Sequence, residues 1–285
     1  MNADVLSYLR CPICELPLTE SGAGPVRAVR CGRRHSFDIA RQGYVNLSAG
    51  RAPHSGDTAD MVQARQEFLD AGHYDFLSTA LRDAAAGPVG PTGPAPPLVV
   101  DAGAGTGHHL ARVLDRLPAA VGLALDVSKP ALRRAARTHP RAAAALCDTW
   151  GRIPLADASA ALLLNVFAPR NGPEFRRVLR PDGTLLVVVP AADHLRELVG
   201  PLRLLRVDPA KAERVAGSLG RHFEPVGESA HRRRLSLRRT EVRTLVRMGP
   251  SAWHAEPVRL AERLAALSEP ISVTASVLLT AYRPR

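Results

Sequence analysis

The chain has 285 residues, of which 46% are hydrophobic, so it can bury one large core and a smaller one beside it. Its formal net charge of +11 indicates a polyanionic partner, and nucleic acid is the first candidate. Codon bias toward arginine is an alternative explanation of the charge, because Lys129 and Lys211 are the only lysines. No apolar run approaches the ~20 residues of a membrane-spanning helix and the N-terminus has no apolar signal segment, which argues against a membrane protein and favours a cytoplasmic one.

Residues 1–50 hold three of the four cysteines, in the pattern C-x2-C-x16-C-x3-H. The pattern consists of Cys11, Cys14, Cys31 and His35. Two chelating pairs about one hairpin apart suit tetrahedral Zn²⁺, because each tight turn lets both of its side chains reach the same ion. Four protein ligands leave no position for water, so the pattern predicts one structural zinc ion in a small zinc-ribbon domain. Cys147 has no such companions, and we expect a buried, small hydrophobic side chain there.

Residues 51–97 are expected to form a helical connector and a linker. Hydrophobic side chains from Met61 to Leu69 recur at helical spacing, and Ser55 or Asp57 can cap this first helix. A second helix is expected from about Tyr74 to Ala86. The stretch GPVGPTGPAPP that follows has no packing potential and marks a domain boundary.

Residues 98–285 alternate apolar strands with amphipathic helices. Strands are predicted at PLVVDAG, AVGLALDV, AAAALCD, AALLLNVF, GTLLVVVP, HRRRLSLR and ISVTASVLLTAY. The helix GPEFRRVLRPDG is expected to end at its Pro-Asp-Gly turn. This alternation predicts an α/β fold with a doubly wound parallel sheet, in which the last two strands complete a seven-stranded sheet in antiparallel fashion.

A glycine-rich loop joins the first strand of this domain to the helix after it. The loop contains Asp101, Gly103, Gly105, Thr106 and Gly107. A dinucleotide-binding loop, G-x-G-x-x-G, would need glycine at position 108, where this chain has histidine. Glycine at every second position behind an acid is instead the D-x-G-x-G-x-G loop of class I (Rossmann-like) methyltransferases, which bind S-adenosylmethionine. Glycine there lets the backbone turn sharply and approach a ligand closely.

Two acidic residues at the ends of the next two strands fit the same ligand. Asp126 ends the second strand, where a carboxylate can accept hydrogen bonds from both ribose hydroxyls. Asp148 follows the third strand and can accept from the exocyclic amine of adenine, while Thr149 or Trp150 can line the ring. The loop, the acids and the strand order together predict an S-adenosylmethionine site.

Five motifs spread along the chain carry a family resemblance. They are CPIC…CGRRHSFDIARQGYVNL, GDTADMVQARQEFLDAGHYDFL, LDVSKPALRRAARTHP, NVFAPRN and PAADHLREL. With them, nearly the whole chain resembles the bacterial 23S rRNA guanine-N1 methyltransferases. It is most similar to the branch from Gram-positive bacteria and actinomycetes, which includes tylosin-resistance methyltransferases. The resemblance implies a methyltransferase domain and a zinc ribbon with the same four ligands.

The resemblance also implies roles that spacing does not reveal. Family contacts to the cofactor match Tyr74, Thr106, Gly107 and His194. Where amine methyltransferases often carry Asn-Pro-Pro-aromatic after the fourth strand, this chain has Asn165-Val-Phe167-Ala-Pro. Asn165 could hydrogen-bond the edge of the target base and Phe167 could stack on it, or the segment could be a packed turn only.

The implied reaction methylates N1 of a guanosine in a 23S rRNA hairpin loop near the peptide exit tunnel. Guanosine 748 is expected and guanosine 745 is the alternative. N1 is hidden in a base pair, so the guanosine must be unpaired and swung out of its stack, and the general base is left open. Arginines expected to contact RNA phosphates are Arg30, Arg33, Arg34, Arg41, Arg232, Arg233 and Arg234. Such a modification would confer or contribute to resistance to tylosin-type macrolides.

Two other functions are left open. A small-molecule methyltransferase of antibiotic tailoring would need neither the ribbon nor the excess of arginine. An inert RNA-binding protein on a methyltransferase scaffold would predict a damaged glycine loop, and this loop is intact. The oligomeric state is open as well, with a homodimer as one alternative.

Overall fold

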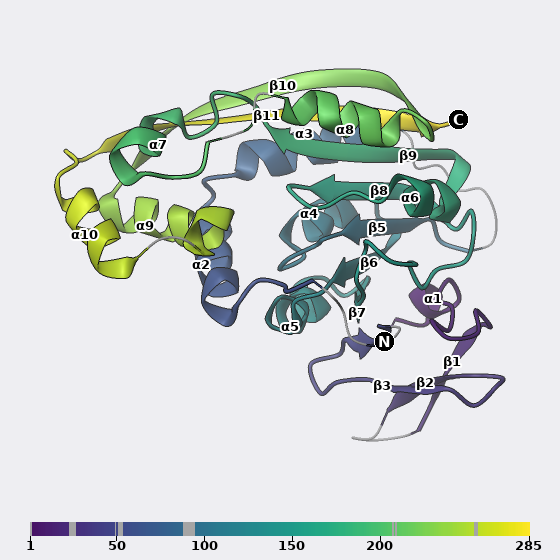
Figure 1. Ribbon diagram of the computed structural model, residues 1–285. Helices are drawn as coiled ribbons and strands as arrows, with labels where there is room; N and C mark the ends of the chain where they lie inside the picture. The colour runs from purple at the N-terminus through teal and green to yellow at the C-terminus, as the bar shows by residue number, and fades with distance from the viewer. Residues whose placement is uncertain are drawn as a thin grey trace.

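A computed structural model describes residues 2–22, 27–48, 50, 54–87, 95–206, 208, 210–253 and 256–285, without the side chains of 211–213 and 216. It shows a small three-stranded sheet near the N-terminus and a large sheet with helices on both faces (Figure 1). None of the described helices is long and apolar enough to cross a membrane. Part of the Pro/Gly stretch expected as a linker, residues 88–94, lies outside the described residues, so the boundary there stays a prediction.

The N-terminal unit begins with a short helix and continues as an antiparallel sheet. Its elements are α1 (Ala3–Leu6), β1 (Leu18–Ser21), β2 (Ala28–Cys31) and β3 (Ser36–Asp38). Asn2 caps α1, because its side chain accepts hydrogen bonds from the amides of Asp4 and Val5. β2 is the central strand and pairs with both neighbours. Figure 1 places this unit at one edge of the large sheet.

Over the part of the chain that the structure describes, the large sheet has eight strands in the order β10-β11-β9-β8-β5-β6-β7-β4. Their bounds are β4 (Val45–Asn46), β5 (Leu98–Ala102), β6 (Val121–Asp126), β7 (Ala142–Leu146), β8 (Ala160–Val166), β9 (Leu179–Pro190), β10 (Phe223–Leu237) and β11 (Ile271–Pro284). Strands β4 to β9 pair in parallel, and β11 and β10 follow in antiparallel fashion.

The expectation of seven strands was wrong, because the segment after the small sheet adds an eighth. β4 pairs in parallel with β7, with Val45 opposite Ala145 and Asn46 opposite Leu146. Val45 is fully buried, and the amide of Leu47 donates to the carbonyl of Leu146 at 3.0 Å. An uncovered β7 edge would leave a row of backbone groups without partners, and β4 satisfies part of that row.

Helices cover both faces of the sheet, as a doubly wound fold requires (Figure 1). On one face lie α3 (Asp75–Ala85), α4 (His108–Arg116) and α5 (Lys129–Thr138), and on the other α6 (Gly172–Val178) and α8 (Lys211–Leu219). Near the carboxyl ends of the parallel strands gather α2 (Ala59–Asp70), α7 (Arg196–Leu202), α9 (Arg239–Met248), η1 (Pro250–Trp253) and α10 (Pro257–Ala265).

Two helix boundaries differ from those expected. Thr58 caps α2, since its hydroxyl accepts from the amide of Met61 at 3.3 Å, whereas Ser55 and Asp57 lie too far upstream. Helix α6 ends at Val178 and does not reach the Pro-Asp-Gly turn. Leu179 is fully buried and already extended opposite Ala160 in the sheet, so tertiary pairing begins β9 before that turn.

The N-terminal unit shares its hydrophobic core with the large sheet. Leu9 and Val29 are fully buried in the same cluster as Leu98 and Val100 of β5. The backbone ties the two parts as well, because Leu9 forms an antiparallel bridge with Leu155. Burial of a common set of apolar side chains therefore fixes the small sheet against the large one.

We expect Leu9→Ala to lower the stability of the whole chain rather than of the small sheet alone. Removing a fully buried leucine side chain costs about 2–5 kcal/mol. Both tryptophans, Trp150 and Trp253, lie outside the N-terminal unit, so their fluorescence reports unfolding of the rest of the chain.

Urea unfolding should then show one transition at a lower midpoint in the tryptophan signal. Leu205→Ala serves as the control, because this leucine is 55% exposed and its loss should change stability by less than about 0.5 kcal/mol. An unshifted tryptophan transition in Leu9→Ala would show instead that the N-terminal unit unfolds independently.

Candidate functional site

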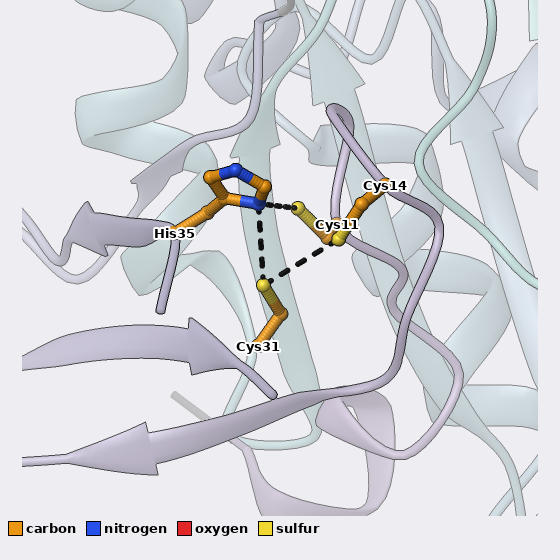
Figure 2. Close-up of side chains that lie close together, drawn as sticks. All are labelled: Cys11, Cys14, Cys31 and His35. Atoms are coloured by element: carbon orange, nitrogen blue, oxygen red, sulfur yellow. Dashed lines mark hydrogen bonds between the residues drawn. The ribbon is translucent and has the colours of Figure 1, made fainter. Parts of the chain in front are cut away.

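The four predicted metal ligands lie together in the N-terminal unit (Figure 2). Their ligand atoms are all within 4.8 Å of one another. His35 Nδ1 is 3.5 Å from Cys11 Sγ and 3.4 Å from Cys31 Sγ, and Cys14 Sγ is 3.6 Å from Cys31 Sγ. Tetrahedral zinc with the usual bond lengths separates two sulfurs by about 3.8 Å and a sulfur from a nitrogen by about 3.5 Å. The four side chains are therefore positioned to bind a metal ion, and their chemistry suits zinc.

Two tight turns bring these ligands together. In the first turn, the amide of Glu15 donates to the carbonyl of Cys11 at 2.8 Å. In the second turn, the amide of Arg34 donates to the carbonyl of Cys31 at 2.9 Å. Each turn has one residue with left-handed backbone, Glu15 with φ of 62° and Arg34 with φ of 66°. Burial raises the pKa of Cys31, but hydrogen bonds from Cys14 and from the His35 and Arg33 amides outweigh it and lower the pKa to about 6. The thiolate that a metal needs is thus favoured.

Cys147 lies apart from this cluster, as expected. It is 2% exposed at the end of β7, and burial, with the nearby carboxylates of Asp148 and Glu174, raises its pKa to about 12. This thiol is a packed hydrophobic residue rather than a ligand.

The glycine loop lies at the carboxyl end of β5, where it packs against β6. The amides of Gly103 and Ala104 both donate to the carbonyl of Leu125, at 2.9 and 3.0 Å. Gly103 has φ of +83°, and a Cβ there would lie 2.4 Å from the Cβ of Ala168. Gly105 has φ of +54°, and a Cβ there would lie 3.0 Å from Nη1 of Arg65. A side chain at Gly103 would clash with Ala168, and one at Gly105 would strain the left-handed backbone and press on Arg65.

Asp126 holds the loop from the neighbouring strand. Its Oδ2 accepts from the amide of Gly105 at 2.8 Å and its Oδ1 accepts from the amide of Ser128 at 2.8 Å. Burial raises the pKa of Asp126, and these two hydrogen bonds oppose the rise. The carboxylate that the sequence assigns to ribose recognition thus also fixes the loop.

Asp101 is a buried acid beside this loop. It is 2% exposed, and its Oδ1 has no hydrogen-bond partner among the described residues. Burial and the charge of Asp126 raise its pKa to about 7. An unpartnered buried acceptor is costly unless a ligand satisfies it, and the ammonium group of an amino acid would do so. The residues of the loop therefore fit S-adenosylmethionine, which carries such a group.

Thr106 faces a polar cavity beside the loop. Its hydroxyl is buried without a partner among the described residues, and the residue is 2% exposed. The cavity has a volume of about 440 Å³ and lies between α2, α4 and α5, with His108, Arg112 and Arg137 in its walls. Gly107, the N-cap of α4, has φ of +76° and packs against Ala135.

Three aromatic side chains from distant parts of the chain meet near the ends of β8 and β9. Tyr74 lies at the start of α3, and its ring centroid is 6.4 Å from those of both Phe167 and His194. Phe167 and His194 are 6.0 Å apart. The hydroxyl of Tyr74 is 3.4 Å from His194 Nε2, and burial raises the pKa of this tyrosine. Phe167 is 42% exposed and has φ of +52°, a strained conformation for a phenylalanine.

Asn165 is buried beneath this aromatic group. Its Nδ2 donates to the carbonyls of Ala102 at 3.1 Å and Pro169 at 2.8 Å, and it has no exposed surface. Its Oδ1 is buried without a partner among the described residues. Asn165 therefore holds two loops together, and only its oxygen is left to accept a further hydrogen bond.

Asp148 and Thr149 lie at the carboxyl end of β7, as expected. Asp148 Oδ2 is 2.8 Å from His54 Nδ1, and Thr149 is 8% exposed. The amide nitrogen of Asn171 lies within hydrogen-bonding distance of three carbonyls in this loop, those of residues 149, 150 and 151. Sequence reasoning missed His54 and Asn171. An N-cap signal before Gly-Pro marks Asn171, but no local pattern reveals its bonds to this loop.

The seven predicted RNA-binding arginines are exposed, in two groups at different places. One group, Arg30, Arg33, Arg34 and Arg41, belongs to the N-terminal unit, and the other, Arg232, Arg233 and Arg234, belongs to β10. Arg232 lies opposite Ser276 in the sheet and pairs with Asp193 at 3.2 Å. We call the group of Tyr74, Phe167 and His194 the aromatic corner. Since His194 Nδ1 contacts the backbone of Ser276, the β10 arginines lie beside this corner.

Comparison with known proteins agrees with this architecture. Residues 9–49 match a zinc-ribbon family described as RlmA, N-terminal. A Streptomyces fradiae protein named 23S rRNA (guanine(748)-N(1))-methyltransferase is 52% identical over 100% of this chain and 99% of its own. A Micromonospora griseorubida protein, provisionally named a 23S rRNA (guanine-N(1)-)-methyltransferase, is 68% identical over 100% of both chains. A crystal structure from Bacillus halodurans, described provisionally as a methyltransferase, has a TM-score of 0.50 and 16% identity over 72% of this chain and 97% of its own.

The predicted fold class is confirmed by these findings, with the strand number corrected to eight. The metal-ligand set is confirmed as a group positioned to bind one ion. The individual cofactor and base contacts stay predictions.

We expect one zinc ion per chain, because four ligands in tetrahedral spacing close the site. Cys14→Ser should lower the zinc content to well below one equivalent and reduce the stability of the N-terminal unit. Cys147→Ala is the matched control, since that cysteine is outside the cluster and its loss should leave the zinc content at one. Elemental analysis of protein purified without chelators measures both, and wild-type protein that holds no zinc would contradict the assignment.

Asp101→Asn should change how stability depends on pH. The pKa of Asp101 is about 7 in the folded chain, against about 3.9 for an aspartate in the unfolded chain. Between these values the unfolded chain loses its proton while the folded chain keeps it, so the free energy of unfolding falls as pH rises from about 4 to 7. This difference in pKa would lower the free energy of unfolding by roughly 4 kcal/mol between about pH 4 and pH 7.

Asparagine cannot ionise, so the variant should gain stability relative to wild type across that pH range and keep a constant difference above pH 7. Urea unfolding of both proteins at several pH values measures the difference. Two stability curves that run parallel from pH 4 to 7 would show that Asp101 ionises normally in the folded chain.

Proposed function

The chain belongs to the 23S rRNA (guanine-N1)-methyltransferases, and from this premise we propose that it transfers a methyl group from S-adenosylmethionine to N1 of a guanosine in a 23S rRNA hairpin loop. The observation that carries the proposal is 52% identity over the full length to a relative named for guanine 748. We therefore propose guanosine 748, near the peptide exit tunnel, as the target, and the cytoplasm as the location.

The residues around the glycine loop would hold the cofactor, which supplies a methyl group already activated on a sulfonium. Asp126 would accept from the ribose hydroxyls with the lone pairs that Gly105 and Ser128 leave free. Asp148 and Thr149, one strand further, would meet the adenine. The buried Oδ1 of Asp101 would accept from the ammonium group. Tyr74 and His194 would close the site where the cofactor and the base meet.

The aromatic corner would hold the target base. Phe167 is the exposed aromatic ring at the end of β8, and its strained backbone aims it away from the core. A guanine that has left its stack needs a new partner for its face, and Phe167 would supply it. Asn165 Nδ2 is committed to Ala102 and Pro169, so only its Oδ1 could accept from the base edge. These side chains orient the base and exclude water, which is the main task when the methyl donor is activated.

The two arginine groups would hold the RNA on either side of this corner. Arginines of the N-terminal unit would contact phosphates of the hairpin stem, and Arg232 to Arg234 would contact phosphates beside the aromatic corner. N1-methylation removes a hydrogen-bond donor and adds bulk near the macrolide site. We therefore propose that the modification confers or contributes to tolerance of tylosin-type macrolides.

Methylation of a transcribed 23S rRNA hairpin by the purified chain tests the function, with primer extension locating N1-methylguanosine at one loop position. Gly105→Val should lower the rate by at least 100-fold, because a branched side chain would strain the backbone and meet Arg65. Gly217→Val is the control, since a Cβ at this glycine of α8 meets nothing within 4 Å and the rate should stay within about twofold. Expression in a sensitive host should raise tolerance to tylosin, and Gly105→Val should abolish the gain.

Other outcomes would favour the other two functions. Methylation of a macrolide as fast as of the hairpin would favour a small-molecule methyltransferase. Tight hairpin binding without cofactor binding or methyl transfer would favour an inert RNA-binding protein.

A further inference from the structure

Trp150 is a large aromatic side chain about half of which is exposed. It is one of two tryptophans in the chain, and 51% of it is exposed at the carboxyl end of β7. A large apolar side chain gains about 1.5–3 kcal/mol from full burial, and Trp150 forgoes much of that gain. A polar residue at this loop position would avoid exposing an indole to water.

The backbone that carries Trp150 is held firmly on both sides. The amide of Trp150 donates to Asp148 Oδ1 at 3.0 Å, and its carbonyl accepts from Asn171 Nδ2 at 2.8 Å. The same Asn171 nitrogen is 3.1 Å from the carbonyl of Thr149 and 3.2 Å from that of Gly151. Asn171 Oδ1 also caps α6 by accepting from the amide of Glu174. An exposed ring on a fixed backbone is preorganised for binding, because little freedom is lost when a partner arrives.

The loop that carries Trp150 is linked both to the segment after Phe167 and to the N-terminal unit. On one side, Asn171 links this loop to the segment that begins at Phe167. On the other side, Arg152 pairs with Glu15 at 2.6 Å, and Glu15 follows Cys14 in the first metal-binding turn. The ring of His54 lies beside the indole, with centroids 5.8 Å apart and planes 33° from parallel.

This position suits an unpaired nucleotide next to the target. When a guanosine swings into a pocket, its neighbour in the loop loses a stacking partner. Aromatic side chains take up such bases at about 1–3 kcal/mol per base, without regard to sequence. RNA that reaches from the N-terminal unit to Phe167 would pass Trp150, whereas the other half-exposed tryptophan, Trp253, lies in η1, which packs against α9.

We propose that Trp150 is a stacking platform for the unpaired nucleotide adjoining the target guanosine, and that Asn171 is the residue that positions it. This inference rests on the proposed function, because it concerns how the same site binds its RNA. Of the two residues expected to line the adenine of the cofactor, Thr149 or Trp150, it leaves Thr149 in that role. The two roles of Trp150 differ in the ligand that contacts the indole.

Fluorescence separates the two roles directly. Trp253→Phe leaves Trp150 as the only tryptophan. Titration with the 23S rRNA hairpin should quench its emission, since a stacked base quenches indole, whereas S-adenosylhomocysteine alone should leave the emission within a few per cent. Emission that responds to S-adenosylhomocysteine and not to the hairpin would overturn the proposal and assign Trp150 to the adenine.

Kinetics provide a second test. Trp150→Ala should raise KM for the hairpin about 5- to 150-fold, the equivalent of one lost stacking contact, with kcat within about twofold and unchanged affinity for S-adenosylhomocysteine. Trp150→Phe should recover most of the loss, because it keeps an aromatic face. Trp253→Ala, the matched control with 53% exposure, should behave as wild type.

Asn171→Ser tests the positioning role. Serine keeps the helix cap but lacks the amide that holds the three carbonyls. KM for the hairpin should therefore rise while the unfolding midpoint and kcat stay close to wild type, and the fluorescence anisotropy of Trp150 in the Trp253→Phe background should fall. A variant with unchanged KM and anisotropy would remove Asn171 from the proposal.

Failure of this proposal is distinguishable from failure of the proposed function. If Trp253→Phe methylates the hairpin and Trp150→Ala does so with wild-type KM, the platform is wrong and the function stands. If neither wild type nor Trp253→Phe methylates the hairpin, the proposed function is wrong, and so is the stacking role of Trp150 that rests on it.

Discussion

The pairing of β4 with β7 is the interaction on which the arrangement of this protein depends. The N-terminal unit is small and buries little apolar surface of its own, so metal ligation must stabilise its turns. It could still move freely relative to the large sheet. The parallel pairing of Val45 and Asn46 with β7, the bridge from Leu9 to Leu155 and a shared core remove that freedom. The metal-binding turns are thereby held at a set place relative to the carboxyl ends of the strands.

Polar side chains that bond to the backbone then shape the functional end of the sheet. Asp126 holds the glycine loop, Asn165 joins the ends of β5 and β8, and Asn171 holds the loop after β7. Each holds the backbone of an irregular loop through hydrogen bonds that the loop does not form within itself. Because strands β5 to β8 end side by side, three short loops far apart in the sequence become one surface, with Phe167 and Trp150 exposed on it.

Charge is distributed in two ways that serve different ligands. The chain has an excess of eleven positive charges, and one group of exposed arginines lies on the N-terminal unit and another on β10. Such a field attracts a polyanion from a distance and weakens with salt. The centre of the site is acidic instead, since the buried Asp101 and the half-buried Asp126 lie beside the glycine loop. Acids at that depth suit a cation and the hydroxyls of a small ligand, so a basic surface and an acidic centre coexist without conflict.

Local spacing by itself determined the metal ligands and the class of the large domain. Cys11 and Cys14 share one turn and Cys31 and His35 another, so their separation in sequence already limits their separation in space. The same holds for the glycine register of residues 103–107 and for the alternation of strands and helices. Only the tertiary structure decided that β4 joins the large sheet, that Thr58 caps α2, and that Asn171 holds the loop of Trp150. These contacts depend on which backbone groups a neighbouring element leaves without partners, or on which of several adjacent caps fits the final path of the chain. The periodicity of the sequence does not predict these contacts, because they form only when distant segments pack together.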